Sequence, residues 1–354
     1  MEKSKLPLVS KTAPWGNNPN KIWLASTVSL SRNIDRFNFP NKLGEEKKKQ
    51  IITLIGEPLL GSNLLDNPVL VKADEMTPLD KEFLYEHFLT NRSFHQAHGG
   101  EGFVVDGSGC FLAALNMRDH LLLQMIDCRE EIEDTWNFLV KIETSLGQKI
   151  SYAFNSKFGF LTADPADAGT GLTVSIFLQV TALIHLNRLE DFIDTHRDDA
   201  VSITGLQGKA GEMIGDLLTI RNNYSLGLTE ENILTSLRSF ATKIHMAEKS
   251  ARSELRQNGA HAHIKDMVGR AYGLLEHSYQ METIEALNAI SLLKLGVELG
   301  WVSGITMPVL NALFFQCRRA HLLYQLNEEA PQQELLHKRA EYIHKVLQEA
   351  KLQV

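Results

Sequence analysis

The stretch FGFLTADPADAGTGLTVSIFLQVTAL, residues 158–183, contains the most informative structural pattern in this 354-residue chain. Its first six residues, 158–163, are mostly aromatic and aliphatic, as is typical of a strand. The glycine-rich turn GTG at 169–171 is not a phosphate-binding P-loop, because no Lys-Ser or Lys-Thr pair opens a helix behind it. The spacing of apolar residues over 173–186 predicts a helix.

Further runs of β-branched and aromatic residues predict strands separated by glycine-rich turns. These runs are 22–31, 102–106, 109–116 and 149–154. Helical periodicity interrupts these runs at 80–89 and 129–146. Beyond about residue 230 the rest of the chain has helical periodicity. Thr229 is the expected N-cap of the long helix that begins there. The later helices are expected at 229–255, 281–299 and 333–351. Clustered strands without strict strand–helix alternation indicate an α+β fold.

Length and charge restrict the class of protein. A chain of 354 residues can form two or three domains. The net charge is −7 and no segment concentrates Lys and Arg, which argues against a nucleic-acid partner. The mixed run EEKKKQ at 45–50 is expected to be a solvated face.

No run of about 20 apolar residues predicts a membrane span, and the polar segment 1–21 lacks a signal-peptide core.

Cysteine and histidine spacing does not predict a metal site. The three cysteines are far apart in the sequence and form no C-x-x-C pair, which is typical of a reducing compartment. His261 and His263 would share one face of a strand, but no third ligand lies near them in the sequence. We therefore expect a cytoplasmic protein without a bound metal and without a membrane partner.

Four stretches together resemble one family. ASTVSLSRN (25–33) is similar to S-S-R-V/I-R-L-A-R-N, and NMRDHLLLQ (116–124) to N-E-E-D-H-L/I-R-I-Q. The opening stretch, 158–183, is similar to G-Y-L-T-x-C-P-T-N-x-G-T-G-L-R-A-S-V-M-x-H-x-P-A-L. ITGLQGKAGE (203–212) and NNYSLGLTEENI (222–233) are similar to I-R-G-x-x-G-E and S-N-x-x-x-L-G-x-S/T-E-x-D/E-I. In order and spacing these motifs resemble the ATP:guanido phosphotransferases, and within them the bacterial protein-arginine kinases.

The resemblance implies a fold and a division into domains. Residues 22–255 would form a guanido-kinase (glutamine-synthetase-like) α+β catalytic domain, with an antiparallel sheet flanked by helices. Residues 1–21 would be a flexible N-terminal lead. Residues 256–354 would form an all-helical C-terminal domain with a dimerisation or regulatory role.

The resemblance also implies a set of nucleotide-binding positions. These are Ser26, Thr27, Val28, Ser29, His87, Leu122, Thr173, Val174, Ser175, Thr204, Gly205 and Gly208. Phosphoryl transfer depends on positioning and on cations that neutralise phosphate charge. At five of the positions the family has an arginine and this chain does not: Thr27, Ser29, Leu122, Thr173 and Thr204. His87 corresponds to a histidine near the adenine, or it is simply packed in the core.

The catalytic positions of the family differ as well. Its two motif glutamates correspond to Met117 and Arg118, the glutamate after the G-x-x-G loop to Lys209, and its thiol to Asp164. Two positions with a carboxylate in the family, those of Arg118 and Lys209, thus carry a cation in this chain. In the family this region binds a cationic guanidinium. Arg118 and Lys209 could contact phosphates and rebuild a nucleotide site. We favour the alternative, in which Arg118 pairs with Asp164 or Asp119.

Other motif residues are retained, which indicates a retained fold: Asn116, Asp119, His120, Gly169, Thr170 and Gly171. In protein-arginine kinases a motif R-D-x-x-R-A forms a phosphoarginine-binding pocket. Of that motif, LLHKRA (335–340) keeps only Arg339 and Ala340. The resemblance therefore implies at most a remnant of the pocket, which could still attract an anion, or a plain basic helix face.

Two functions stay open at this point. Loss of a transition-state arginine costs about 10³–10⁵ in rate, and loss of a general base about 10²–10⁴. We therefore expect a pseudokinase that acts as a binding or regulatory scaffold in protein quality control. By resemblance it would be a homodimer whose partner is a Clp-type chaperone or a zinc-containing activator protein. The alternative is an active ATP-dependent protein-arginine kinase with a rebuilt site, which would use ATP with Mg; otherwise no cofactor is expected.

Overall fold

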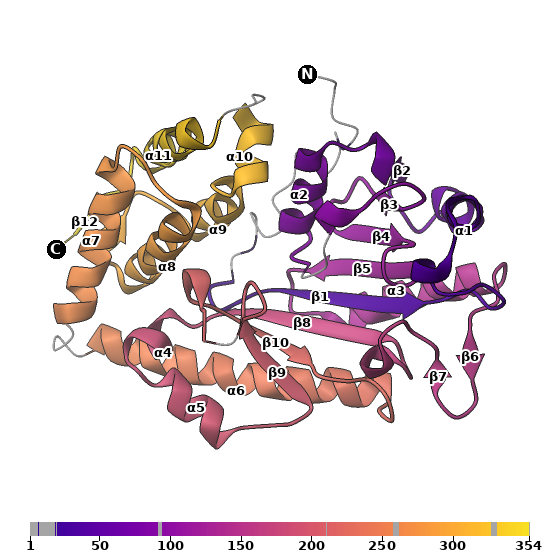
Figure 1. The fold of residues 1–354 in the computed structure, drawn as a ribbon. Helices are drawn as coiled ribbons and strands as arrows, with labels where there is room; N and C mark the ends of the chain where they lie inside the picture. The colour runs from indigo at the N-terminus through magenta and orange to yellow at the C-terminus, as the bar shows by residue number, and fades with distance from the viewer. Residues whose placement is uncertain are drawn as a thin grey trace. The chain divides into compact units, whose positions relative to one another are not determined.

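A computed structural model describes residues 6, 18, 20–90, 94–209, 211–257, 262–326 and 331–353. Strands and helices intermingle up to about residue 222, and helices dominate after it (Figure 1). The contacts within the chain define two compact units. The first comprises Met1–Pro14, Ser26–Ser175 and Arg221–Leu237, and the second Trp15–Ala25, Ile176–Ile220 and Arg238–Val354. Because these units group residues differently, the division into 22–255 and 256–354 stays a prediction.

Eight strands form a sheet in the order β2-β3-β4-β5-β1-β8-β10-β9. The strands are β1 (Trp23–Arg32), β2 (Val69–Lys72), β3 (Gly102–Val105), β4 (Phe111–Leu115), β5 (Leu121–Asp127), β8 (Leu172–Gln179), β9 (Val201–Gly205) and β10 (Leu217–Asn222). The pairs β2–β3, β3–β4, β4–β5 and β1–β5 are antiparallel. The expected α+β fold with an antiparallel sheet flanked by helices is confirmed.

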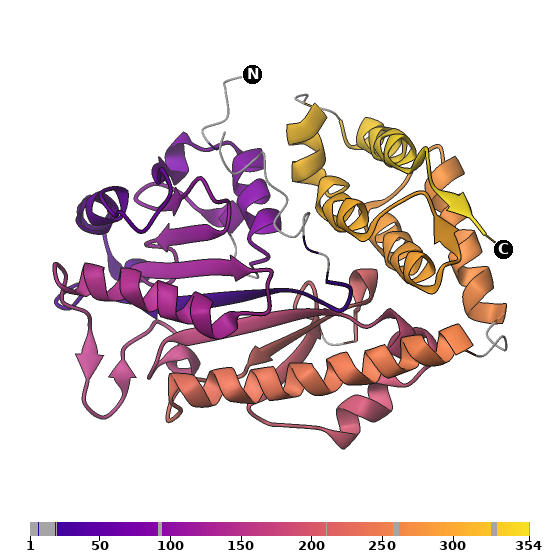
Figure 2. The ribbon, with the colours of Figure 1, turned by 180° about the vertical axis from the view of Figure 1, so that it is seen from behind.

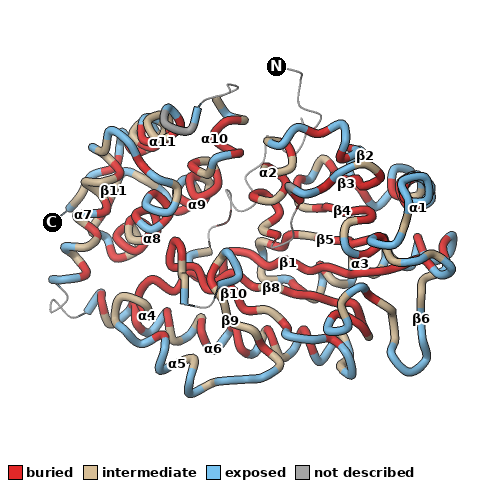
Figure 3. Tube along the Cα trace, viewed as in Figure 1, coloured by how far each residue is buried: buried red, intermediate tan, exposed pale blue. Residues whose placement is uncertain are grey.

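Strand β1 lies between β5 and β8, and all ten of its residues are buried (Figure 3). In its register with β5, Val28 lies opposite Met125 and Leu30 opposite Leu123, so one face of the pair is apolar. Adjacent residues of a strand point to opposite faces. The hydroxyl side chains that alternate with Val28 and Leu30 therefore share the other face of the sheet.

Three helices accompany the strands of the first unit: α1 (Glu45–Leu60), α2 (Pro78–His87) and α3 (Ile132–Gly147). A capping box between Thr77 and Asp80 starts α2. Helix α3 packs on β5, on the sheet face turned to the viewer in Figure 2. The run EEKKKQ opens α1 and is mostly exposed, but Lys48 is buried and its Nζ lies 2.9 Å from Oε1 of Glu101.

The expected helix over 173–186 is wrong in its first half. Residues Leu172–Gln179 form β8, and only Thr181–His185 form a helix, α4. Seven of the eight residues of β8 are buried. A strand buried on both faces loses the polar–apolar alternation that would distinguish it from a buried helix, so the periodicity was misleading.

Other short elements also differ from the expectation. The runs 149–154 and 158–163 form only a two-residue pair, β6 (Phe154–Asn155) with β7 (Gly159–Phe160). Strands do not stop at residue 230, because β11 (Val302–Ser303) pairs with β12 (Lys351–Leu352). Pairs this short carry too few side chains for a period to be read from sequence.

The remaining helices are α5 (Leu189–Thr195), α6 (Glu230–Gln257), α7 (Ala262–His277), α8 (Thr283–Leu299), α9 (Met307–Gln316), α10 (Arg319–Leu326) and α11 (Gln332–Leu347). Short 3-10 turns lie at Pro40–Lys42, Ala73–Glu75, Phe94–Gln96, Pro165–Asp167 and Ile214–Asp216. The backbone N–H of Asn232 donates to Oγ1 of Thr229 at 3.2 Å, so the predicted N-cap of α6 is confirmed. Helix α8 contacts both α7 and α9, and its Ile290 and Leu293 are fully buried.

Most of the expected N-terminal lead, 1–21, lies outside the described residues. Of the part that is described, Asn18 is buried, and its Nδ2 donates to the Leu24 carbonyl at 2.6 Å. Asn311 in α9 donates in turn to the Asn18 carbonyl at 2.9 Å. No helix in the described part of the chain is both long enough and apolar enough to span a bilayer.

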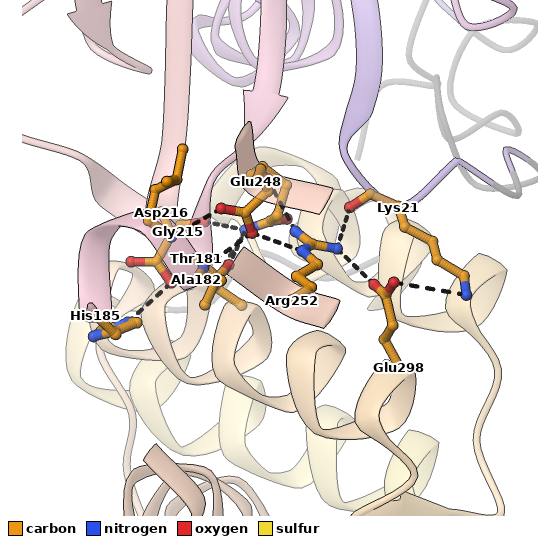
Figure 4. Close-up of polar contacts among 12 residues, drawn as sticks. Lys21, Thr181, Ala182, His185, Gly215, Asp216, Glu248, Arg252 and Glu298 are labelled. Atoms are coloured by element: carbon orange, nitrogen blue, oxygen red, sulfur yellow. Dashed lines mark hydrogen bonds and ion pairs between the residues drawn. The ribbon is translucent and has the colours of Figure 1, made fainter. Parts of the chain in front are cut away.

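A buried ionic network ties the second unit together (Figure 4). Glu248 of α6 accepts the N–H groups of Ala182 and Leu183 at the start of α4, both at 2.9 Å. Arg252, one turn later, donates to Glu248 and to Glu298 of α8, each at 2.6 Å. It also donates to the carbonyl groups of Lys21 at 3.1 Å and Gln179 at 3.0 Å. One guanidinium thus joins four segments that are distant in sequence.

Removing this guanidinium should destabilise the protein strongly. In Arg252→Met the buried Glu248 loses its cationic partner, and breaking a buried pair in this way costs about 3–5 kcal/mol. The matched control is Arg270→Ala, which removes an exposed pair with Asp266 and should cost at most about 0.5 kcal/mol. Urea-induced unfolding followed by circular dichroism measures both values. Equal losses for the two variants would contradict the assigned role of Arg252.

Candidate functional site

The phosphate-contact positions implied in the first unit lie on its central strands. Thr27 and Ser29 point to the same face of β1, because side chains alternate along a strand. In β5, Gln124 lies directly opposite Ser29, and Leu122 lies directly opposite Ser31. This face of the sheet therefore presents hydroxyl, amide and alkyl groups where phosphate binding would require cations.

Backbone contacts engage several of these positions. The Ser29 hydroxyl donates to the Thr173 carbonyl at 3.2 Å. The Val174 N–H donates to Oδ1 of Asn222 at 2.8 Å. Other implied nucleotide positions on these strands are buried or half-buried: Ser26, Val28 and Ser175. The side chains of Ser29 and Asn222 thus join β8 to its two neighbours, β1 and β10.

Arg32 is the arginine of the first motif that this chain keeps, and its guanidinium makes structural contacts. Nε donates to Glu143 at 2.9 Å, and Nη1 donates to the carbonyls of Ser31 and Thr170, each at 2.9 Å. The guanidinium carbon lies 3.6 Å from the centre of the Phe160 ring. Its side chain is only 4% exposed. Arg32 therefore holds the end of β1 in place and does not compensate for the missing arginines.

These residues do not fit a magnesium-bound triphosphate. A polyphosphate carries several negative charges, and its binding in a protein site depends on cationic or metal partners that neutralise them. Thr27, Ser29, Leu122 and Thr173 supply no charge, and the buried Arg32 is committed elsewhere. These four positions of the first unit thus supply no cationic side chain for a polyphosphate.

The turn between β4 and β5 keeps its motif residues in structural roles. Asn116, at a φ of 56°, donates through Nδ2 to the carbonyls of Lys48 at 2.8 Å and Gly100 at 3.0 Å. Asp119 accepts from Nδ2 of Asn33 and from the Ala163 N–H, both at 2.7 Å. These contacts fix the turn against α1 and against the segment that follows β7.

His120 completes this turn as a neutral ring. Its Nδ1 accepts the Ile34 N–H at 2.9 Å, so Nε2 carries the proton and donates to the Asn38 carbonyl at 2.9 Å. Burial lowers the pKa of His120 because it penalises the charged ring, and this outweighs the hydrogen bond to Asn38, which raises the pKa. The ring therefore anchors the backbone after β1 and is fully buried.

The retained GTG turn also has a structural explanation. Gly171 has a φ of +63°, and a Cβ there would lie 2.6 Å from the Ser31 carbonyl oxygen, so only glycine fits. The Thr170 hydroxyl accepts the Leu172 N–H at 3.1 Å and closes the turn, which Gly169 precedes. The turn brings β8 alongside β1, where the Ser31 N–H donates to the Gly171 carbonyl at 2.9 Å.

The two altered catalytic positions of the first unit lie together. Met117 is half-buried, and Arg118 is exposed. A guanidinium N–H of Arg118 donates to Oδ2 of Asp164, and its Nη1 lies 3.8 Å from Oδ2 of Asp167. The predicted ion pair between Arg118 and Asp164 is thus present, and it places a guanidinium beside the position of the family's thiol.

Arg221 extends this cluster from the end of β10. Its Nη2 lies 3.7 Å from Oδ1 of Asp167, so the Asp167 carboxylate lies between two guanidinium groups. A hydrogen bond from the Ala166 N–H lowers the pKa of Asp164, and the Arg118 guanidinium lowers it further. The carboxylate of Asp164 is therefore ionised at neutral pH.

The remaining loop positions belong to the second unit. Thr204 is half-buried near the end of β9, and the Gly205 N–H donates to the Lys209 carbonyl at 3.0 Å. Gly208 has a φ of +78° in the turn between them. The ammonium of Lys209 is exposed and lies 3.2 Å from a carboxylate oxygen of Glu212. Lys209 is thus paired within its own loop.

His87 is a packed residue. It is fully buried, stacks on Phe83 with ring centres 5.3 Å apart, and its Nε2 donates to the Gly109 carbonyl at 2.8 Å. Burial lowers the pKa of this ring from 6.5 to about 4. The alternative that His87 contacts an adenine finds no support in this geometry.

The remnant of the regulatory motif lies on α11. Arg339 is 2% exposed, and its Nε and Nη1 donate to the carbonyls of Cys317 and Met281, each at 2.7 Å. Ala340 is buried beside it. Arg339 therefore joins three segments of the helical region.

The described residues include no cluster of three or more His, Cys, Asp or Glu side chains arranged to hold a metal ion. Of the histidine pair noted above, His261 lies outside the described residues, and His263 lies in the first turn of α7 rather than on a strand.

Comparison with known proteins decides the family. The model of the ATP:guanido phosphotransferase C-terminal catalytic domain matches residues 61–251, more than half of the chain. The chain belongs to the ATP:guanido phosphotransferase family. Within this family, the model of the protein-arginine kinase McsB C-terminal domain matches residues 261–353.

Relatives of this chain include protein-arginine kinases. That of Chlamydia pneumoniae is 37% identical over 311 residues, 88% of this chain and 86% of the relative. That of Chlamydia muridarum is 34% identical over 299 residues, 84% of this chain and 83% of the relative. A solved lombricine kinase shares the fold, with a TM-score of 0.56 and 20% identity over 66% of this chain and 68% of that chain.

Sequence reasoning missed two members of the charged cluster, Asp167 and Arg221. Arg221 lies one residue before the quoted stretch 222–233, so the comparison of motifs did not include it. Asp167 lies three residues after Asp164, the residue at the thiol position, and no motif in the sequence indicated its role. Neither the pairing of Arg221 with Asp167 nor the structural role of Arg32 could be derived from spacing alone.

The buried His87 should make the protein less stable in acid. Its pKa in the folded state, about 4, lies below 6.5, so the unfolded chain takes up a proton first as pH falls. The contribution of neutral His87 to the free energy of unfolding is therefore complete above pH 6.5 and falls as the pH approaches 4. About 2 kcal/mol of this contribution is lost by pH 5. Urea unfolding at pH 7.5 and pH 5 should show a smaller pH dependence for His87→Gln than for the wild type.

The control for this prediction is His277→Gln. His277 is exposed, with 76% of its side chain accessible, and its replacement should leave the pH dependence unchanged. An unaltered pH dependence in His87→Gln would show that another group governs the loss of stability in acid.

Proposed function

We propose that this guanido phosphotransferase relative is a pseudokinase, a binding or regulatory scaffold in protein quality control. The observation that carries the proposal is the ion pair of Arg118 with Asp164. Where the family presents glutamates to a cationic guanidinium, this chain presents a guanidinium of its own. The hydroxyl and leucine side chains on β1, β5 and β8 support the proposal, because they cannot neutralise a polyphosphate.

The expected loss of rate decides whether catalysis by this protein is impaired or absent. A single transition-state arginine contributes about 10³–10⁵, and a general base about 10²–10⁴. Such contributions are not additive, but the replacement of every one of these groups leaves little catalysis. We therefore take the family's reaction to be lost, and its binding of partners to be the retained activity.

A second candidate is an active ATP-dependent protein-arginine kinase with a rebuilt site. Arg118 and Arg221 are the cations that favour it, because their side chains are partly exposed, at 48% and 29%. Both already face Asp167, however, so phosphate would have to displace a carboxylate. ATP with magnesium would be the cofactor pair in that case.

The nucleotide should neither stabilise this protein nor be turned over. In thermal unfolding with millimolar magnesium and a non-hydrolysable ATP analogue, we expect an unchanged melting temperature. Saturation to 100 times a dissociation constant would instead stabilise the fold by about 2.7 kcal/mol. With ATP and an arginine-rich protein substrate, we expect no acid-labile phosphate on arginine.

The Chlamydia pneumoniae protein-arginine kinase, a relative at 37% identity, serves as the positive control for both assays. A clear upward shift in melting temperature together with phosphoarginine formation would support the second candidate and refute the first.

We also propose that the chain acts in the cytoplasm as a homodimer, and that its partner is a Clp-type chaperone or a zinc-containing activator protein. The match of residues 261–353 to the C-terminal domain of protein-arginine kinases supports this. Light scattering of the purified protein should give a mass near twice 39.8 kDa. A mass of one chain at micromolar concentration would exclude the stable dimer.

A further inference from the structure

The amine of Lys294, in the second half of α8, is buried in the second unit. Lys294 is 3% exposed, and its Nζ donates to Oε1 of Gln179, the last residue of β8, at 3.3 Å. The centre of the Phe314 ring lies 5.3 Å from the same nitrogen. Within the described part of the chain, no carboxylate forms an ion pair with Lys294. Burying an ammonium without a carboxylate partner is costly, so this position favours the neutral amine.

The glutamates of the buried network are already engaged by Arg252. Glu248 and Glu298 both accept hydrogen bonds from its guanidinium (Figure 4). Arg252 also donates to the Gln179 carbonyl at 3.0 Å, so the guanidinium and the Lys294 amine contact the same residue. An arginine keeps its charge at neutral pH. A proton on Lys294 therefore adds a second buried positive charge near the first.

The amide of Gln179 is fixed in its orientation. Its Nε2 donates to the carbonyl of the residue before Asp216 at 2.6 Å and to the Ser291 hydroxyl at 2.7 Å. The Ser291 hydroxyl donates in turn to Oδ2 of Asp216, which lies 3.3 Å from Nε2 of His185. Because both donors of the amide are used in this way, its oxygen faces Lys294. The carboxylate of Asp216 is separated from the amine by Gln179 and Ser291.

The titratable and charged groups of the network around Lys294 come from several elements: Glu248 and Arg252 of α6, Glu298 of α8, Asp216 before β10, His185 of α4, Lys21 before β1 and Cys317 after α9. Burial and then the Arg252 guanidinium lower the pKa of Lys294 from 10.5 to about 7, and Cys317 opposes this shift. The amine is therefore neutral above about pH 7 while it is buried.

The sign of the resulting pH dependence follows from proton uptake. An opening that exposes Lys294 to water returns its pKa to 10.5, so between about pH 7 and 10.5 the open state binds a proton that the closed state lacks. Opening of α8 therefore becomes less favourable as the pH rises through this range. Below pH 7 both states carry the proton, and the dependence on Lys294 ends.

We propose that Lys294 is a proton-sensitive switch, which holds α8 firmly on the end of β8 when its amine is neutral and loosens this contact when its amine is protonated. Helix α8 also contacts α4, α7 and α9. The switch therefore controls how firmly the C-terminal helices are held within the second unit. This inference goes beyond the proposed scaffold function and does not rest on it, because it concerns a regulatory device in the fold.

Hydrogen exchange of the full chain tests the switch. The backbone amides of residues 288–296 in α8 are followed by mass spectrometry at pH 6.5 and pH 8.5, and division by the intrinsic exchange rates gives protection factors. In the wild type we expect protection to rise about 25-fold between these pH values, because the pKa of Lys294 is about 7 when closed and 10.5 when open.

Substitutions of Lys294 separate its proton from the other groups of the network. Lys294→Met and Lys294→Gln cannot be protonated, so both should show strong protection with less than a twofold change between the two pH values. Lys294→Arg stays charged and should be weakly protected at both. Lys243→Met is the matched control, since it removes an exposed lysine of α6, and it should keep the rise of the wild type.

A rise in protection that persists in Lys294→Met and Lys294→Gln would overturn the proposal, as would protection in the wild type that does not change with pH. The outcome is independent of the nucleotide and kinase assays. Protection that does not depend on pH, together with absent phosphoryl transfer, would refute the switch and leave the pseudokinase in place.

Discussion

The first unit depends on how the end of β1 is held. Arg32 is almost completely buried there and must find partners for its charge, which it does through Glu143, two backbone carbonyls and the face of Phe160. The neighbouring Asn33 donates to Asp119 and accepts the His120 N–H. A buried guanidinium left unpaired would be far costlier than any single contact it makes. The geometry of the β4–β5 turn and of the GTG turn follows from this requirement.

The same requirement gives several motif residues a structural role. Asn116, Asp119, His120 and Gly171 satisfy backbone groups or allow close approach of chains, and none of them needs a substrate to justify it. Four of the positions at which the resemblance implies arginines, Thr27, Ser29, Leu122 and Thr173, carry no charge, which supports the proposed loss of the reaction.

Much of this could be predicted from the sequence, and the limits are physical. The motif order predicted the family and the antiparallel sheet, and the charge reversal at Arg118 predicted its pair with Asp164. The strand Leu172–Gln179 was mistaken for a helix because burial on both faces removes the alternation. The contacts of Arg221 and Arg32 join residues that are distant in sequence, so no local pattern encodes them. Which segments meet is a property of the topology.

The guanidinium of Arg252 has a consequence for the order of folding. Its bond to the Lys21 carbonyl spans 231 residues, and the bond from Asn311 to Asn18 spans 293. Contacts of such long sequence separation close late, because the entropy of a large loop must be overcome first. On the ribosome, the bond between Asn311 and the Asn18 carbonyl cannot form until α9 has been synthesised.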